Sequence, residues 1–190
     1  MTIRAIPQIG HPVLRTPTRW VSIDELATIG MQKVIDDMID TMRDANGAGI
    51  AANQIGESVR ICVIGVENNP RYPYKPPIPL TILVNPEITV VGDETYASND
   101  GCLSVPVRGD LDRWATIEVT AVDRNGLPFT QRYRGLTAGT VQHEVDHLDG
   151  GLFIDRVTDP RTLSTWENFD QFHKEAFVRH ITAVVDRHGS

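Results

Sequence analysis

The segment that most constrains this chain runs from Gln142 to Gly150 and holds two histidines, His143 and His147, four residues apart. Side chains at this spacing lie on the same face of a helix one turn apart, so the two imidazoles can bind one metal ion. Glu144 follows the first histidine and can reach a water on that metal, where a carboxylate acts as a base. The segment indicates a catalytic metal site on a helix, and histidines satisfied in the core or at the surface are the structural alternative.

Length and charge narrow the class of protein. A chain of 190 residues predicts one domain spanning residues 1–190, because a single core of ordinary size fits that length. The formal net charge of -7 disfavours nucleic acid as a partner, since no run of Lys and Arg offsets it. No apolar run is long enough to span a membrane. With no secretory signal and only two cysteines, Cys62 and Cys102, a reducing cytoplasmic compartment is expected.

Apolar periodicity predicts an α+β fold. The proline-punctuated residues 3–20 are expected to form an extended arm, and a capping box begun by Ser22 predicts a helix over residues 23–45. Further helices are predicted from residue 137 to the Gly150 stop and over residues 162–187. Alternating β-branched residues and turn signals predict strands, namely 59–66, 81–85, 87–91, 116–123 and 128–133. We expect mainly antiparallel sheets around a central metal-binding helix, with an N-terminal and a C-terminal helix.

Two non-helical segments have small residues and one polar group of interest. Residues 47–54 are small and apolar and end in Gln54, so an extended ligand could pair with their backbone as an added strand. A tight helix-to-strand connection with Gln54 facing solvent is equally compatible. Cys102 follows Gly101 in a polar setting and is either a metal ligand or a free cysteine in a turn. Cys62 lies in a predicted strand and is expected to be a small buried hydrophobe. The proline-rich residues 68–79 are expected to form a surface excursion.

A catalytic metal usually takes three protein ligands and an open fourth position, so the histidine pair needs a partner. Glu167 stands twenty residues beyond His147, a spacing that resembles the thermolysin-like metallopeptidases. It lies on an amphipathic helix, however, where an exposed carboxylate is expected without a metal. Cys102 is accompanied by Leu103 and by the segment ending in Gln54, which together could bind a metal and stabilise an oxyanion. These accompanying residues favour Cys102 as the third metal ligand.

Three segments together resemble a known family. Residues 47–54, 100–104 and 143–148 occur in the order and rough separation of the three signature motifs of the peptide deformylases. Residues 10–15, Gly-His-Pro-Val-Leu-Arg, also look like that family, so the similarity covers about residues 3–155. The resemblance implies a hydrolase that removes the formyl group from N-formylmethionyl nascent chains near the ribosome exit and releases formate.

The resemblance also assigns roles to individual residues. It implies that Cys102, His143 and His147 hold the metal and that Glu144 is the general base and acid. Gln54 and the backbone N–H of Leu103 would face the developing oxyanion. The family commonly uses Fe(II), with zinc, nickel or cobalt as substitutes, and one thiolate with two imidazoles suits several late divalent ions.

A substrate site is expected beside the metal. Backbone around Gly49 and Ile50 would bind the peptide as an added strand, and Gly101 would let the main chain come close to it. An apolar pocket for the methionine side chain is expected on the same face of the helix as His143. Its expected lining residues are Leu136, Gly139 and Thr140.

One departure from the family pattern concerns Asp100, which stands where the second motif usually begins with Glu. A carboxylate here would anchor a nearby arginine, Arg108 or Arg113, and the shorter side chain would loosen that support. A divergent paralogue with a changed substrate is therefore one alternative. A binding module with a structural metal is another, although such sites are usually closed by four protein ligands and only three are evident.

Overall fold

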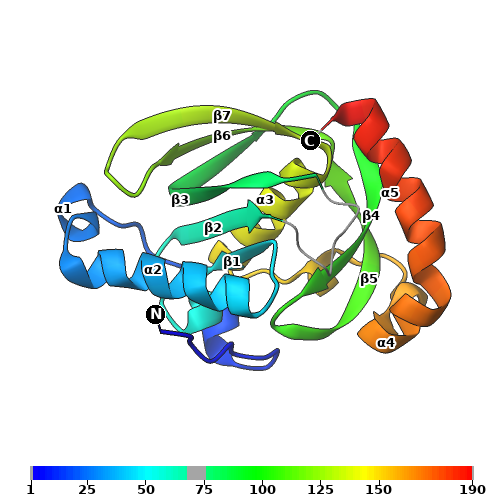
Figure 1. The fold of residues 1–190 in the computed structure, drawn as a ribbon, viewed down its shortest axis with the longest axis horizontal. Helices are drawn as coiled ribbons and strands as arrows, with labels where there is room; N and C mark the ends of the chain where they lie inside the picture. Colours follow the sequence, from blue (N-terminus) through cyan, green and yellow to red (C-terminus); the bar gives the residue numbers. More distant parts are fainter. Residues whose placement is uncertain (1, 68–75, 190) are drawn as a thin grey trace.

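The computed structural model describes residues 2–67 and 76–189, and its main strands form two antiparallel sheets (Figure 1). The five-stranded sheet, in the order β1-β2-β3-β6-β7, consists of β1 (Gly49–Ala51), β2 (Ile61–Val66), β3 (Ile78–Val90), β6 (Thr116–Val122) and β7 (Pro128–Arg134). The three-stranded sheet consists of β4 (Thr95–Cys102), β5 (Val105–Trp114) and β8 (Ser164–Thr165). The helices are α1 (Ile23–Leu26), α2 (Ile29–Asp44), α3 (Gly135–Leu148), α4 (Trp166–Asn168) and α5 (Lys174–His188). The predicted α+β class is confirmed.

Strand β2 of the five-stranded sheet is buried on both faces. On β2, Cys62 and Ile64 belong to the cluster shared with α3, whereas Ile61 and Val63 belong to the cluster shared with α2. Successive strand residues point to opposite faces, so a strand between two helices must be apolar at every position. This accounts for the uninterrupted apolar sequence of β2 and confirms that Cys62 is a small buried hydrophobe.

Helix α3 lies at the centre of the molecule and contacts strands of both sheets (Figure 1). Apart from His143 and Asp146, which are partly exposed, every residue of α3 is buried. A helix that is buried nearly all round lies in the core, and the polar side chains of α3 are therefore expected to meet other polar groups there. The predicted central helix is therefore present.

The C-terminal segment covers β4 and β5 (Figure 1). The helix predicted over residues 162–187 begins later, at Trp166, because the Thr165 side chain caps it by accepting a hydrogen bond from the backbone N–H of Asn168. A π-helical turn over Phe169–His173 separates α4 from α5. This turn shifts the apolar stripe, so that Phe169 is buried while Phe172 is 65% exposed.

Two further boundaries differ from the predictions. The helix predicted over residues 23–45 is two helices, because Thr28 acts as a second N-cap and accepts from the backbone N–H of Met31. The strands predicted over residues 81–85 and 87–91 are one strand, β3. A register shift between Val84 and Glu87, with positive φ at Asn85, produced the apparent break.

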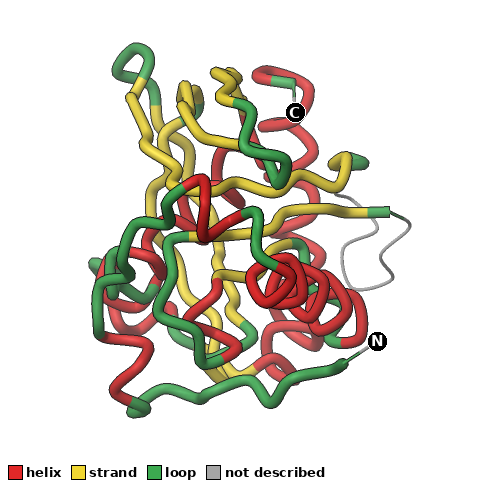
Figure 2. Tube along the Cα trace, turned by 90° about the vertical axis from the view of Figure 1, so that its left-hand side faces the viewer, coloured by secondary structure: helices red, strands yellow, loops and turns green. Residues whose placement is uncertain are grey.

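The β4–β5 hairpin was not predicted. Its strands carry Asn, Asp, Gly and Arg, which disfavour a strand assignment from propensity alone, and cross-strand pairing overrides that preference. Its turn is bonded to the N-terminal arm, since the Ile9 N–H donates to the Ser104 carbonyl and Gln8 Nε2 donates to the Leu103 carbonyl. The arm runs as loop along one edge of the molecule, as predicted, apart from a 3-10 turn over Pro12–Arg15 (Figure 2).

Most of the proline-rich segment predicted as a surface excursion, residues 68–75, lies outside the described residues. Its last residues, Ile78 and Pro79, belong to β3. Within residues 2–67 and 76–189, none of the helices has the length and apolar character needed to cross a membrane.

Candidate metal centre

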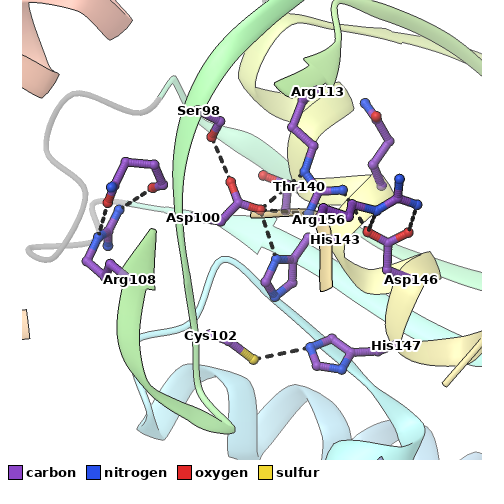
Figure 3. A network of polar contacts seen from close by, with 12 residues as sticks. Ser98, Asp100, Cys102, Arg108, Arg113, Thr140, His143, Asp146, His147 and Arg156 are labelled. Carbon is purple, nitrogen blue, oxygen red and sulfur yellow. Dashed lines mark hydrogen bonds and ion pairs between the residues drawn. The ribbon is translucent and has the colours of Figure 1, made fainter. Parts of the chain in front are cut away.

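Three side chains from two elements meet at the centre of the molecule. Cys102 is the last residue of β4, and His143 and His147 lie one turn apart on α3. One ligand atom from each of the three lies within 4.8 Å of the other two. Cys102 Sγ and His147 Nε2 are 3.2 Å apart and point toward each other (Figure 3). Among the described residues this cluster has no fourth protein ligand.

This arrangement fits one divalent ion. Sulfur and nitrogen ligands at about 2.3 and 2.0 Å from a tetrahedral ion stand roughly 3.5 Å apart, close to the observed separation. One thiolate and two imidazoles leave a coordination position open, as catalytic sites require. Burial, the charge of His143 and the charge of Arg113 lower the pKa of His147 well below its usual value. His147 is therefore neutral, which is the form that binds a metal.

Glu167, the rival third ligand, does not join the cluster. It lies in α4, is exposed, and is absent from the group of convergent ligand atoms. An exposed carboxylate on an amphipathic helix is what the sequence predicts without any metal.

Asp100 orients the first histidine. Its Oδ2 lies 3.1 Å from His143 Nδ1, which leaves Nε2 of that ring for the metal. The same Oδ2 accepts from Arg113 Nη2 at 2.7 Å, and Oδ1 accepts from Ser98 Oγ at 2.7 Å (Figure 3). Burial alone would favour the protonated acid, but the Arg113 charge and the His143 hydrogen bond hold the pKa of Asp100 well below its usual range. Burial also opposes protonation of His143, but its hydrogen bonds to Asp100 and Cys102 raise its pKa to about 10, so a metal bound at Nε2 would displace a proton from this ring.

The support of Asp100 extends to the surface through a chain of ion pairs. Arg113 is 2% exposed and bridges Asp100 to Asp146, with Arg113 Nη1 2.7 Å from Asp146 Oδ2. Arg156 closes the chain from outside by donating to Asp146 from Nε and Nη2 at 2.9 and 2.6 Å. The shorter Asp100 side chain therefore has an arginine partner, and that partner is Arg113.

Arg108 does not bind Asp100. Its guanidinium donates to the side-chain oxygen and the carbonyl of Asn99 at 2.8 and 2.6 Å. It also lies 4.5 Å from the ring centre of Trp166 and 4.2 Å from that of Phe169. Buried cations over aromatic faces are stabilised by the negative face of the ring. The expected anchoring of Asp100 by Arg108 is therefore wrong, because Arg108 is held by the C-terminal segment instead.

A cavity of about 80 Å³ opens beside the cluster. Its lining residues come from four parts of the chain and are Gly47, Ala48, Gly49, Gln54, Tyr96, Ser98, Asn99, Asp100, Gly101, Cys102, Leu103, Arg108, Leu136, Gly139, Thr140, His143, Glu144 and Phe177. All three residues expected to form the methionine pocket border it. Ile50 does not border the cavity, and its side chain is buried in the core beneath α2, so the contact expected of it is one of its backbone alone.

Glu144 is held against a glycine. It is 4% exposed, and a Cβ built on Gly49 would collide with its side chain. Gly49 is therefore required for the position of Glu144 as well as for an accessible backbone. The same reasoning applies to Gly101, whose missing side chain makes room for the ring of Trp166.

Gln54 lies inside the site. It is 2% exposed, so the alternative in which its amide faces solvent is wrong. Its Oε1 accepts from the backbone N–H of Ala51 at 3.0 Å, which fixes the orientation of the amide. Its Nε2 then donates to Ser104 Oγ at 3.1 Å and to Cys102 Sγ at 3.4 Å. The Gln54 amide therefore lies directly beside the Cys102 sulfur.

Several site residues were not predicted. Tyr96, Ser98, Asn99 and Phe177 border the cavity, and three of them lie on the hairpin strand that the sequence did not reveal. The sequence could have indicated Asp146 as a site residue, since it stands three residues after His143 on the same helix. No such indication existed for Phe177, because an aromatic residue in an amphipathic helix is most simply a core residue.

Comparisons with known proteins agree on one family. The model of a family described as polypeptide deformylase matches residues 3–162. Peptide deformylase 2 of Nostoc sp. is 42% identical over 167 residues, which cover 87% of this chain and 92% of that protein. A crystal structure of the class I type b peptide deformylase from Acinetobacter baumannii superposes with a TM-score of 0.81 at 35% identity, over 83% of this chain and 100% of that one. A structure of that enzyme with bound Met-Ala-Ser gives 0.79 at 36% identity, over 82% of this chain and 99% of that one.

Proposed function

Because the chain belongs to the polypeptide deformylase family, which removes formyl groups from peptides by hydrolysis, we propose that its metal centre hydrolyses the formyl group of N-formylmethionyl chains. The observation that carries the proposal is the convergence of Cys102, His143 and His147 at the wall of a cavity that also holds Glu144 and Gln54. The comparisons favour neither a paralogue with a changed substrate nor a metallopeptidase.

Glu144 is the proposed proton carrier. A divalent ion held by Cys102, His143 and His147 would supply Lewis-acid activation of a water and of the formyl carbonyl. Glu144 lies beside these ligands and lines the cavity, where it takes the proton of the attacking water. It then returns that proton to the amine that leaves as formate is released. Burial of this carboxylate keeps bulk water from competing for the proton.

Gln54 and Leu103 are the proposed donors to the oxyanion that develops as the formyl carbon becomes tetrahedral. Both residues line the cavity. The Gln54 amide is oriented by its bond to Ala51, so its Nε2 needs little rearrangement to donate to a new acceptor beside Cys102. The backbone N–H of Leu103 is the second proposed donor.

The peptide would bind along β1. This strand is at the edge of its sheet and, among the described strands, pairs with β2 alone, so its other side can accept an added strand at Gly49. The methionine side chain would then enter the cavity toward Leu136, Gly139 and Thr140. The Met-Ala-Ser peptide bound to the Acinetobacter baumannii relative supports this choice of ligand.

We further propose Fe(II) as the ion used by the protein, with zinc, nickel and cobalt as substitutes, since the mixed thiolate and imidazole set suits all of them. Action on nascent chains near the ribosome exit in the cytoplasm is part of the same proposal. Its physical support is that the two cysteines are free thiols, as is usual in a reducing compartment.

The decisive experiment measures formate release from formyl-Met-Ala-Ser by Fe(II)-loaded wild-type protein and by Glu144→Gln. The amide keeps the size of the side chain but cannot accept the proton, so the rate should fall by about 10²–10⁴-fold while the bound metal stays near one equivalent. The matched control is Glu87→Gln, which alters an exposed carboxylate on β3 and should leave the rate unchanged. Formate release by fully metallated Glu144→Gln at the wild-type rate would refute the role of Glu144. No release by metallated wild-type protein would refute the substrate.

A further inference from the structure

The C-terminal segment contributes a wall to the substrate cavity although it lies outside the family match. That match ends at residue 162, and Phe177 is on α5. Phe177 nevertheless lines the cavity together with Leu136 and Thr140, the residues that face the methionine side chain in the proposed function. It is held there by packing against the buried cluster that contains Tyr96 and Leu136.

A second and larger cavity lies behind this wall. It measures about 470 Å³, is bordered by β4, the residues around β8, and the π-helical turn with α5, and is open to solvent on one side. Its lining residues are Ala97, Ser98, Asn99, Asp110, Arg161, Thr162, Leu163, Ser164, Phe169, His173, Ala176, Phe177 and His180. Three residues border both cavities, namely Ser98, Asn99 and Phe177.

Of these three residues, Phe177 has by far the largest side chain. Ser98 is short and donates to Asp100, and Asn99 is tied to Arg108 and Asp110 by hydrogen bonds. The ring of Phe177 meets that of Phe169 edge-on at 5.5 Å between centres and lies 5.7 Å from the Arg108 guanidinium. An aromatic ring held by packing on several sides is a rigid partition, because a rotamer change would displace its neighbours.

We propose that Phe177 is a specificity-determining residue, which separates the two cavities and so limits the size of the first side chain of the peptide. The proposal rests on the proposed function, since it takes that side chain to enter the smaller cavity. A substrate whose first side chain is larger than methionine meets the Phe177 ring. Without that ring the side chain extends into the larger cavity beneath α5.

The test compares two substrates, formyl-Met-Ala-Ser and the same peptide with 2-naphthylalanine in place of methionine. For each variant the measured quantity is the ratio of kcat/KM for the bulky peptide to kcat/KM for the methionine peptide. Phe177→Ala should raise this ratio at least about tenfold, chiefly through a lower KM for the bulky peptide. Phe177→Trp, which enlarges the partition, should lower it. Opposite changes in the two variants cannot come from a general loss of stability.

Phe172→Ala is the matched control, since Phe172 is an aromatic residue of the same segment, 65% exposed and outside both cavity linings. The ratio of the two kcat/KM values in Phe172→Ala should equal that of the wild type. A second readout is calorimetric binding of the unformylated bulky peptide to the zinc-loaded protein, which Phe177→Ala should strengthen relative to Met-Ala-Ser.

An unchanged ratio in folded Phe177→Ala, checked by near-ultraviolet circular dichroism, would overturn the inference and leave the proposed function intact. Phe177→Leu takes the place of the alanine variant if that variant does not fold. Failure of the wild type to release formate from formyl-Met-Ala-Ser would overturn the proposed function, and the inference with it.

Discussion

At the scale of single residues, the position that matters most behind the metal is Asp100. One of its oxygens contacts both His143 and Arg113, so the carboxylate orients the ring proposed to bind the metal and is itself held by a buried cation. The sequence identified Asp100 and offered two arginines as its partner. It could not choose between them, because both lie on β5 and only the register of the β4–β5 hairpin decides which one reaches the carboxylate.

Replacing this carboxylate should weaken metal binding. Asp100→Asn keeps the size of the side chain but removes its charge, so the His143 ring loses a charged partner and Arg113 is left with Asp146. We expect the affinity for Co(II) to fall about 10–100-fold, measured by competition with a chelator. Asp112→Asn, an exposed aspartate on β5, is the control and should bind as the wild type does. Unaltered affinity in Asp100→Asn would show that the ring is oriented by packing alone.

At the scale of elements, helix α3 approaches β4 closely because Gly139 has no side chain. A Cβ at this position would meet the hydroxyl of Tyr96, which donates to the Gly135 carbonyl at 3.0 Å. Sequence patterns located α3 and its ligands, since histidine spacing and apolar periodicity are properties of one segment. They missed β4, because a polar strand is specified by its partner β5 and by the helices that cover it.

Replacing a helical glycine by alanine usually stabilises a protein, but the contact at Gly139 predicts that alanine there destabilises it. Gly139→Ala should lower the free energy of unfolding by about 1–3 kcal/mol, since the methyl group forces Tyr96 or the backbone to move. Gly30→Ala in α2 is the matched control, because a Cβ there meets nothing within 4 Å and should add up to about 1 kcal/mol. Both changes are measurable by urea unfolding. Adding Tyr96→Phe to Gly139→Ala should restore part of the loss, and a stabilised Gly139→Ala would contradict the contact.

At the scale of the whole molecule, the proposed metal ligands connect two sheets. Cys102 ends a strand of the three-stranded sheet, whereas α3 packs its apolar side on the five-stranded sheet. The sequence indicated the ligands but not this division, because the assignment of strands to sheets depends on contacts between distant segments. The same limit applies to Phe177, whose role follows only from the place where α5 lies.

Removing the metal should therefore loosen the molecule as a whole. With metal at one hundred times its Kd, binding stabilises the folded state by about 2.7 kcal/mol. For a chain of this size that corresponds to a rise in Tm of about 5–10 °C. Calorimetry with and without a chelator should show this difference in wild-type protein and lose most of it in Cys102→Ala. Cys62→Ala, which alters a buried thiol in β2, should keep it. An equal shift in Cys102→Ala would remove Cys102 from the ligand set.

The separation of the ligands along the chain has a consequence for how the protein folds. Only His143 and His147 are neighbours before folding, while Cys102 is 45 residues from His147, and Asn53, whose amide donates to the His147 carbonyl, is 94 residues away. Closing such loops costs chain entropy before any contact offsets it. In an unfolded chain, therefore, only two of the three proposed ligands, His143 and His147, are held near each other by the sequence. We therefore expect the ion to be captured late, after the β4–β5 hairpin has docked on α3.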